Sequence, residues 1–346
     1  MGAKRFPSQQ WLRRDRTRKD CFRQRTPMTV CVAALFAWNY APTGSPDDFG
    51  VAAILTADRM ITAGDVQYEP PQFKAAQFTP TTVGLVAGDF AYHSKAIKDT
   101  LRQINDTTSP ENIATIYGQI IQSITRKEAE DLYLAPVGLN TDTFLAQQRD
   151  LADSFVSVLR EQLQQHQGEE TEAIIVGSET LRDRRVIRLF TVDRHGTVSC
   201  HDDVGYAAIG IGAWHARSRL MQYGYVSQFR WIEAVAAMYA AKKAAEIAPG
   251  VGNKTTDMWI IFRDHIEPLR PDIAAELPNI YGRYEQEHQK LIVNSVEELR
   301  QFVLTAGDRG RHDQGRGPFR TDAQTDASPN TTTAKASRKD EAGQKE

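Results

Sequence analysis

Four residues among the first ninety are of types that together could perform acyl-transfer chemistry. Thr29 follows a methionine at the head of an apolar segment, and Asp58 ends the next apolar segment. Lys74 comes 16 residues after Asp58, and Gly88 comes 14 residues after Lys74. Together they offer a hydroxyl nucleophile, a cation that lowers its pKa, a carboxylate that orients this cation, and a glycine N–H for a developing oxyanion. Such a set could hydrolyse an acyl bond.

The chemistry requires Thr29 to be the first residue of the active chain. A threonine with a free amine supplies both nucleophile and base, because the amine can take the hydroxyl proton directly or through water. Glycine at position 88 would let the backbone come close to the substrate. Taken singly, a lysine at a strand edge is commonly a solvated charge and an aspartate at a strand end is commonly a turn residue. The ordered set favours the catalytic interpretation.

This ordered set resembles the proteasome β-subunit family of N-terminal-nucleophile hydrolases, which includes the peptidase subunits of bacterial ATP-dependent ring proteases. The two intervals that separate the aspartate, the lysine and the glycine match those of catalytic proteasome subunits, and segment 57–64 is similar to a segment of the family. The interval from Thr29 to Asp58 is longer than in the family, and a loop inserted at 38–49 accounts for the excess. The resemblance covers roughly residues 29–262.

The resemblance implies an α+β fold, a four-layer αββα sandwich of two stacked antiparallel sheets. It also implies a threonine-type peptidase that acts on peptides or unfolded proteins, with Thr29 as nucleophile and Asp58, Lys74 and Gly88 in support. Such subunits form homo-oligomeric rings that enclose their active sites, and an ATPase is a candidate partner. Two alternatives stay open: a non-catalytic scaffold or binding subunit of this type, and a monomeric amidase of the N-terminal-nucleophile class.

Two positions depart from the family's pattern. The family's serine between two glycines corresponds to Ile211, which cannot donate a hydrogen bond. The family's later aspartate–serine pair aligns best with Asn253 and Thr256, and an asparagine accepts hydrogen bonds but carries no charge. The nucleophile's amine would then be tuned less well, or by other groups such as Asp65 or Asp257. These departures put high peptidase activity in question, but not the fold.

The order of the expected elements favours two stacked antiparallel sheets. Apolar β-rich runs predict strands, and Ser109 followed by Pro110 predicts the start of a helix. Strands are expected at 29–38, 50–58, 73–78, 83–87, 172–177, 186–192, 197–200, 206–212 and 256–262. Helices are expected at 92–104, from Pro110, and at 145–167, 214–224, 229–248, 269–289 and 296–304. This order differs from the βαβ alternation of a parallel sheet and suits helices on the outer faces of two antiparallel sheets.

One folded domain is expected at 29–304, with a different kind of segment on either side. The N-terminal extension 1–28 carries nine Lys or Arg residues against two Asp residues. It could be a propeptide that masks the nucleophile, a basic targeting or binding arm, or the result of a start assigned upstream of Met28, which we favour because Met-Thr is a natural start. Within the domain, 127–168 is expected to be a helical insertion, either an outer helical hairpin or a contact surface for a neighbouring subunit. Segment 305–346 has few apolar residues and is expected to be a disordered tail.

The composition is that of an ordinary soluble globular protein. Of its 346 residues, 41% are apolar and 25% charged, and the net charge of −2 implies no general affinity for nucleic acid or an anionic membrane. The sequence contains no run of about 18 apolar residues that would predict a membrane helix. Three widely spaced cysteines give neither a disulfide framework nor a zinc site, which favours a reducing compartment such as the cytoplasm. No nucleotide-binding motif or spaced metal-ligand set occurs, so no cofactor and no metal are expected.

Overall fold

A computed structural model describes residues 29–39, 49–63, 66–69, 74–166, 168, 170–182 and 184–313. The expected N-terminal extension 1–28 lies outside the described residues, and so does 314–346 of the expected disordered tail 305–346, whereas its first residues, 305–313, are helical. The chain divides into two compact units, Met1–Gly282 and Arg283–Glu346. The sheets and the candidate site belong to the first unit.

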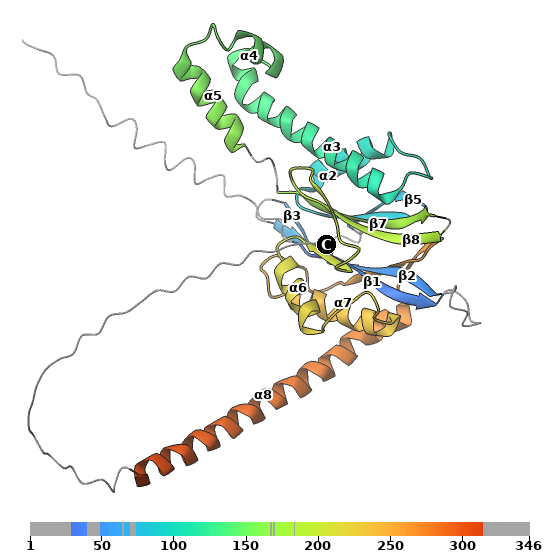
Figure 1. Cartoon of the computed structure of the whole chain (residues 1–346), viewed down its shortest axis with the longest axis vertical. Coiled ribbons are helices and arrows are strands. Elements are labelled where there is room, and N and C mark those ends of the chain that lie inside the picture. Colours follow the sequence, from blue (N-terminus) through green and yellow to red (C-terminus); the bar gives the residue numbers. More distant parts are fainter. Residues whose placement is uncertain are drawn as a thin grey trace, which may run out of the picture. The chain divides into compact units, whose positions relative to one another are not determined.

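The first unit has a mixed α+β fold with two antiparallel sheets (Figure 1). One sheet has the strand order β10-β1-β2-β11-β12, and these strands span Tyr206–Ile209, Cys31–Asn39, Phe49–Ala57, Asp257–Ile261 and Ile266–Pro268. The other has the order β5-β6-β7-β8-β9, and its strands span Ala75–Thr79, Thr82–Ala87, Glu172–Leu181, Arg184–Val192 and Val198–Cys200. A short hairpin pairs β3 (Ile61–Ala63) with β4 (Val66–Tyr68). The predicted α+β class with two antiparallel sheets is confirmed.

The β1–β2 hairpin is apolar on both faces because both faces are covered. Its register pairs Cys31 with Ala57 and runs without interruption to the far end of both strands. Cys31 and Leu35 belong to the core between the two sheets, whereas Val32 and Phe36 pack on the helical side. Successive side chains of a strand point to opposite faces, so a continuous apolar run is what a strand in the interior of a layered fold needs.

Each sheet carries a pair of helices on its outer face. Helices α2 (Phe90–Leu101) and α3 (Pro110–Ala129) pack on the β5–β9 sheet. Helices α6 (Ala213–Gln222) and α7 (Trp231–Ala245) pack on the sheet that contains β1, and the alanines of α7 allow close approach. Figure 1 shows the resulting sequence of layers, with the two sheets between the helix pairs. As predicted from the sequence, Ser109 caps α3, since its side chain accepts from Asn112 N.

The helical insertion is more broken than the sequence pattern indicates. The chain leaves α3 through a π-helical turn at Glu130–Leu134 and a short 3-10 turn at Ala135–Val137. The helix expected at 145–167 is two helices, α4 (Thr141–Gln147) and α5 (Asp153–Gln165). The capping box that opens α4 explains the earlier start: Asn140 and Thr143 each accept from the other's backbone N–H. These elements share a small core of their own, formed by Leu134, Phe144 and Leu159 with their neighbours.

The C-terminal helices expected at 269–289 and 296–304 are a single helix, α8 (Pro271–Asp313). The expected break falls between Lys290 and Ser295, where the chain has neither proline nor glycine to end a helix. The first turns of α8 belong to the first unit, where Leu277 and Tyr281 join the core beside α7. Among the helices of the described segments, α8 included, none combines the length and apolarity needed to cross a lipid bilayer.

Candidate active site

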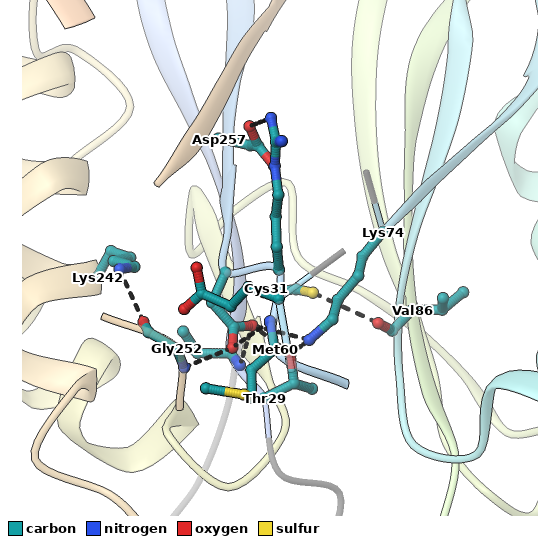
Figure 2. A network of polar contacts seen from close by, with 12 residues as sticks. Thr29, Cys31, Met60, Lys74, Val86, Lys242, Gly252 and Asp257 are labelled. Atoms are coloured by element: carbon teal, nitrogen blue, oxygen red, sulfur yellow. Dashed lines mark hydrogen bonds and ion pairs between the residues drawn. The ribbon is translucent and has the colours of Figure 1, made fainter. Parts of the chain in front are cut away.

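Asp58 is the centre of a buried polar network at the end of β2. Its carboxylate is fully buried, and its Oδ1 atom accepts from Val30 N at 3.1 Å and from Lys74 Nζ at 3.1 Å. The Thr29 hydroxyl also donates to Oδ1. Figure 2 shows Lys74 reaching toward this point from one side, with Thr29 below it. The structure thus brings together three of the four residues that the sequence singles out.

The second carboxylate oxygen of Asp58 is held by backbone. Oδ2 accepts from Gly252 N at 2.7 Å and from Met60 N at 3.3 Å. Within the described residues Asp58 therefore has five donors, one of them the charged Lys74. Burying a carboxylate is costly unless a countercharge and hydrogen bonds replace water, and this site supplies both. The arrangement fixes the position and rotation of the carboxylate.

The Thr29 hydroxyl lies between a cation and an anion. Lys74 Nζ donates to Thr29 Oγ1 at 2.5 Å, while that hydroxyl donates to Asp58. The Lys74 side chain is only 9% exposed. It is therefore not a solvated charge at a strand edge, which was the alternative interpretation of this lysine. Thr29 lies two residues before β1 of the first sheet and Lys74 directly precedes β5 of the second, so the site spans the two sheets. A positive charge at this distance favours the ionised form of a hydroxyl.

A glycine turn after β10 holds the backbone of Thr29. Gly212 N donates to Thr29 O at 3.3 Å, and Gly210 N donates to Glu172 Oε2 at 2.8 Å. Gly210 has a φ of +85°, and a Cβ there would lie 2.4 Å from Thr29 O. Ile211, the residue between the two glycines, packs against the core on the helical side. Only a glycine at position 210 lets this turn approach Thr29 so closely.

Gly88 ends β6 in a conformation that requires glycine. Its φ is +126°, and a Cβ there would lie 2.3 Å from Glu170 O. The end of β6 is tied to the start of β1, because Cys31 Sγ donates to Val86 O at 3.5 Å (Figure 2). Burial raises the pKa of the Cys31 thiol to about 12, so it stays protonated as this bond needs. Val86 N donates to Lys74 O at 3.3 Å, so the end of β6, which Gly88 follows, lies at the same end of its sheet as Lys74.

The groups expected to tune the amine of Thr29 are engaged elsewhere or not described. Asn253 is exposed, and Asp65 lies outside the described residues. Both oxygens of Asp257 accept from Arg59, at 2.6 Å from Nε and 2.6 Å from Nη2. Hydrogen bonds to this carboxylate raise the pKa of the Arg59 guanidinium. Sequence analysis did not find this pair, although an arginine adjacent to Asp58 was a usable signal.

Sequence analysis also missed Lys242, a buried lysine on α7. Its ammonium donates to Gly252 O at 2.9 Å and forms an ion pair with Glu246. Burial lowers the pKa of Lys242. Figure 2 shows Lys242 beside Gly252, on the side of the network opposite Lys74. Lys242 thereby anchors the loop whose Gly252 N–H orients the Asp58 carboxylate.

In comparisons with known proteins, no family model and no curated protein matches this chain. Across the residues that the structure describes, no group of three or more His, Cys, Asp or Glu side chains is arranged to hold a metal ion. The site itself offers the Thr29 hydroxyl, the charges of Lys74 and Asp58, and backbone N–H donors.

Proposed function

We propose that the chain is a threonine-type peptidase of the N-terminal-nucleophile class, with Thr29 as the nucleophile once residues 1–28 have been removed. The observation that carries the proposal is the position of Thr29 Oγ1, 2.5 Å from Lys74 Nζ and hydrogen-bonded to Asp58. The layer order, helices–sheet–sheet–helices, supports the N-terminal-nucleophile fold. The resemblance in residue spacing supports the same class independently of the geometry.

The reaction begins when the free amine of Thr29 takes the proton of its own hydroxyl. The positive charge of Lys74 stabilises the alkoxide, which attacks the carbonyl carbon of the peptide bond. The resulting oxyanion accepts a hydrogen bond from Gly88 N–H. The protonated amine then gives its proton to the leaving nitrogen, the C–N bond breaks, and an ester on Thr29 remains. Water, deprotonated by the same amine, hydrolyses this ester and regenerates the hydroxyl.

Asp58 acts on this reaction through Lys74 and through the backbone. It accepts from Lys74 at 3.1 Å, which holds the ammonium against the hydroxyl, and from Val30 N, which fixes the peptide next to the nucleophile. Catalysis by electrostatic preorganisation requires that charges be in place before the reaction starts. The buried, fully bonded carboxylate meets that requirement.

The first prediction concerns the mature N-terminus. We expect the active protein to begin at Thr29, because a threonine inside a chain has no free amine to serve as base. Intact-mass measurement after reaction with a peptide β-lactone should find one acyl group on a chain that starts at Thr29, and none on the Thr29→Ala protein. Full peptidase activity in a protein that retains residues 1–28 would contradict the assignment and favour a different nucleophile.

A second prediction uses the glycine turn that touches Thr29. Gly210→Ala is expected to lower kcat by more than about tenfold, because its Cβ would meet Thr29 O at 2.4 Å and displace the nucleophile. Gly224→Ala is the matched control, since Gly224 also has a positive φ, +61°, but has open space around its Cβ position. Both variants share the strain of a positive φ, and only Gly210→Ala adds the steric clash, so it should unfold at a lower temperature than Gly224→Ala and alone lose peptide hydrolysis at temperatures where both are folded. Equal activity in the two proteins would show that the Gly210 turn does not position Thr29 for hydrolysis.

We further propose that copies of the chain assemble into a ring that encloses the active sites. Two large apolar side chains support this, because Trp214 on α6 is 77% exposed and Ile232 on α7 is 69% exposed. Burying such side chains between subunits is favourable, and enclosure would protect other proteins from an exposed threonine nucleophile. Analytical ultracentrifugation at micromolar concentration tests the assembly. A protein that sediments only as a monomer would favour a monomeric amidase.

A further inference from the structure

His93, in the first turns of α2, bonds the peptide that carries the proposed oxyanion donor. Its side chain is buried, with Nε2 at 2.9 Å from Ala87 O and Nδ1 at 2.6 Å from the Tyr117 hydroxyl. A carbonyl oxygen can only accept, so Nε2 carries the hydrogen, and Nδ1 of the neutral ring accepts from Tyr117. Burial lowers the pKa of His93 to about 4, which keeps the ring neutral near pH 7. The tautomer is thus fixed by its two partners.

The bond to Ala87 O determines where Gly88 N–H points. The carbonyl of Ala87 and the N–H of Gly88 belong to one planar trans peptide, so the two groups point in opposite directions. A glycine with a φ of +126° has wide conformational freedom, and its preceding peptide can rotate unless something holds it. The hydrogen bond from His93 fixes the direction of Ala87 C=O and therefore also fixes Gly88 N–H, which points away from His93.

Helix α2 holds the hydrogen bond between His93 and Ala87 O in a fixed position. Asp89, which directly follows Gly88, caps the helix by accepting from Tyr92 N at 2.9 Å, and its carbonyl accepts from His93 N at 3.1 Å. The cap and the His93 ring thus hold residues on both sides of Gly88 against the same helical turn. Tyr117, on the neighbouring helix α3, fixes the ring from behind. A loop held in this way keeps its N–H in one direction without a substrate present.

We propose that His93 is a positioning residue for the hydrolase: it orients the Ala87–Gly88 peptide so that Gly88 N–H is preset as the oxyanion donor. The inference rests on the proposed function, because it assigns a role within that reaction. A hydrogen bond to the carbonyl also polarises the peptide and strengthens its N–H as a donor. A role in packing alone would require neither a specific ring nitrogen nor a bond to this particular carbonyl.

Two polar replacements of His93 distinguish the role of Nε2 from that of Nδ1. The amide nitrogen of glutamine takes the place of Nε2, whereas that of asparagine takes the place of Nδ1. His93→Gln should therefore keep the donor to Ala87 O and retain kcat within about fivefold, while His93→Asn should lower kcat by roughly ten- to a hundredfold with KM unchanged, as expected for a weakened oxyanion donor. Thr100→Val is the control for stability, because it removes a buried hydrogen bond of the same helix, from Thr100 Oγ1 to Ala96 O, and leaves both bonds of the His93 ring in place.

The second readout compares binding of a transition-state analogue with binding of a product. A peptide boronate places a negative oxygen near Gly88 N–H, whereas the cleaved product peptide does not. His93→Asn should lose boronate affinity by about the same factor as kcat and keep its affinity for the product peptide. If His93→Asn does not fold, His93→Met removes the donor with a buried apolar side chain, and the same result is expected.

The outcomes distinguish a failure of the proposed hydrolase function from a failure of the proposed role of His93. A wild-type protein that neither hydrolyses peptides nor binds the boronate would overturn the proposed function itself. An active wild type with unchanged kcat in His93→Asn would overturn the role of His93 alone. Equal losses of boronate and product affinity, or equal losses in Thr100→Val, would also overturn it and make His93 a packing residue.

Discussion

Replacing Lys74 with alanine is expected to reduce kcat for a fluorogenic peptide by about a thousandfold or more, since loss of a charge beside the nucleophile removes several kcal/mol of transition-state stabilisation. The ammonium lies 2.5 Å from Thr29 Oγ1 and 3.1 Å from Asp58 Oδ1 in a site that excludes most water. At such distances and with little solvent, one charge has a large effect on the energy of a developing alkoxide. The expected result is an inactive protein that binds peptide product normally.

The fold should survive this substitution with reduced stability, because the buried Asp58 carboxylate loses its countercharge. Asp58 keeps its bonds from Thr29, Val30, Met60 and Gly252 when the Lys74 side chain is removed. Circular dichroism and thermal unfolding will verify that Lys74→Ala remains folded. Lys98→Ala, on the exposed surface of α2, is the matched control and should hydrolyse the peptide at the wild-type rate. Near-normal hydrolysis by Lys74→Ala would show that Lys74 does not contribute to catalysis.

The second large effect is expected for Asp58→Asn, in both stability and activity. Removing one partner of a buried ion pair leaves the other uncompensated, which typically costs about 3–5 kcal/mol. The new amide nitrogen would also face backbone donors, Gly252 N and Met60 N, or else Lys74, because only one of the two atoms can still accept. Urea unfolding measures the loss of stability, and peptide hydrolysis should fall by about a thousandfold or more because Lys74 is no longer held in place.

A double-mutant cycle distinguishes the buried pair from general damage. Lys74→Met should cost less stability in the Asp58→Asn background than in the wild type, because the lysine no longer compensates a buried charge there. Activity should not return in the double variant. Asp272→Asn, which breaks the exposed pair with Arg270, is the control and should leave both stability and hydrolysis unchanged. Additive stability losses for the two buried positions would show that Asp58 and Lys74 are not coupled.

Local patterns in the sequence predicted much of the fold because they reflect local physics. The apolar β1–β2 run and the Ser109–Pro110 start of α3 are properties of neighbouring residues, and both were found at the expected places. Predictions failed where a pattern had no clear end signal. The helix expected at 145–167 is divided into α4 and α5, and the expected gap before 296 is filled by α8.

Some features of the candidate site could likewise be predicted from the sequence, and others could not. Thr29, Asp58 and Lys74 could be selected from the sequence because their types and spacing are distinctive, and the structure joins them by direct hydrogen bonds. Gly88 was selected in the same way, and its positive φ gives it a structural reason to be glycine. The amine-tuning role suggested for Asp257 could not be judged from the sequence, where its bidentate pair with Arg59 is invisible.

What the sequence determined by itself is the set of candidate groups and the strands beside them, because residue type and short-range periodicity are read directly from the chain. Only the tertiary structure decided what holds those groups in place. Gly252 reaches Asp58 across 194 positions of sequence, and Lys242 supports it from a helix whose alanines gave no hint of a functional lysine. His93 bonds Ala87 through one particular ring nitrogen. Such contacts depend on how distant elements pack, and packing of distant elements leaves no regular spacing in the sequence.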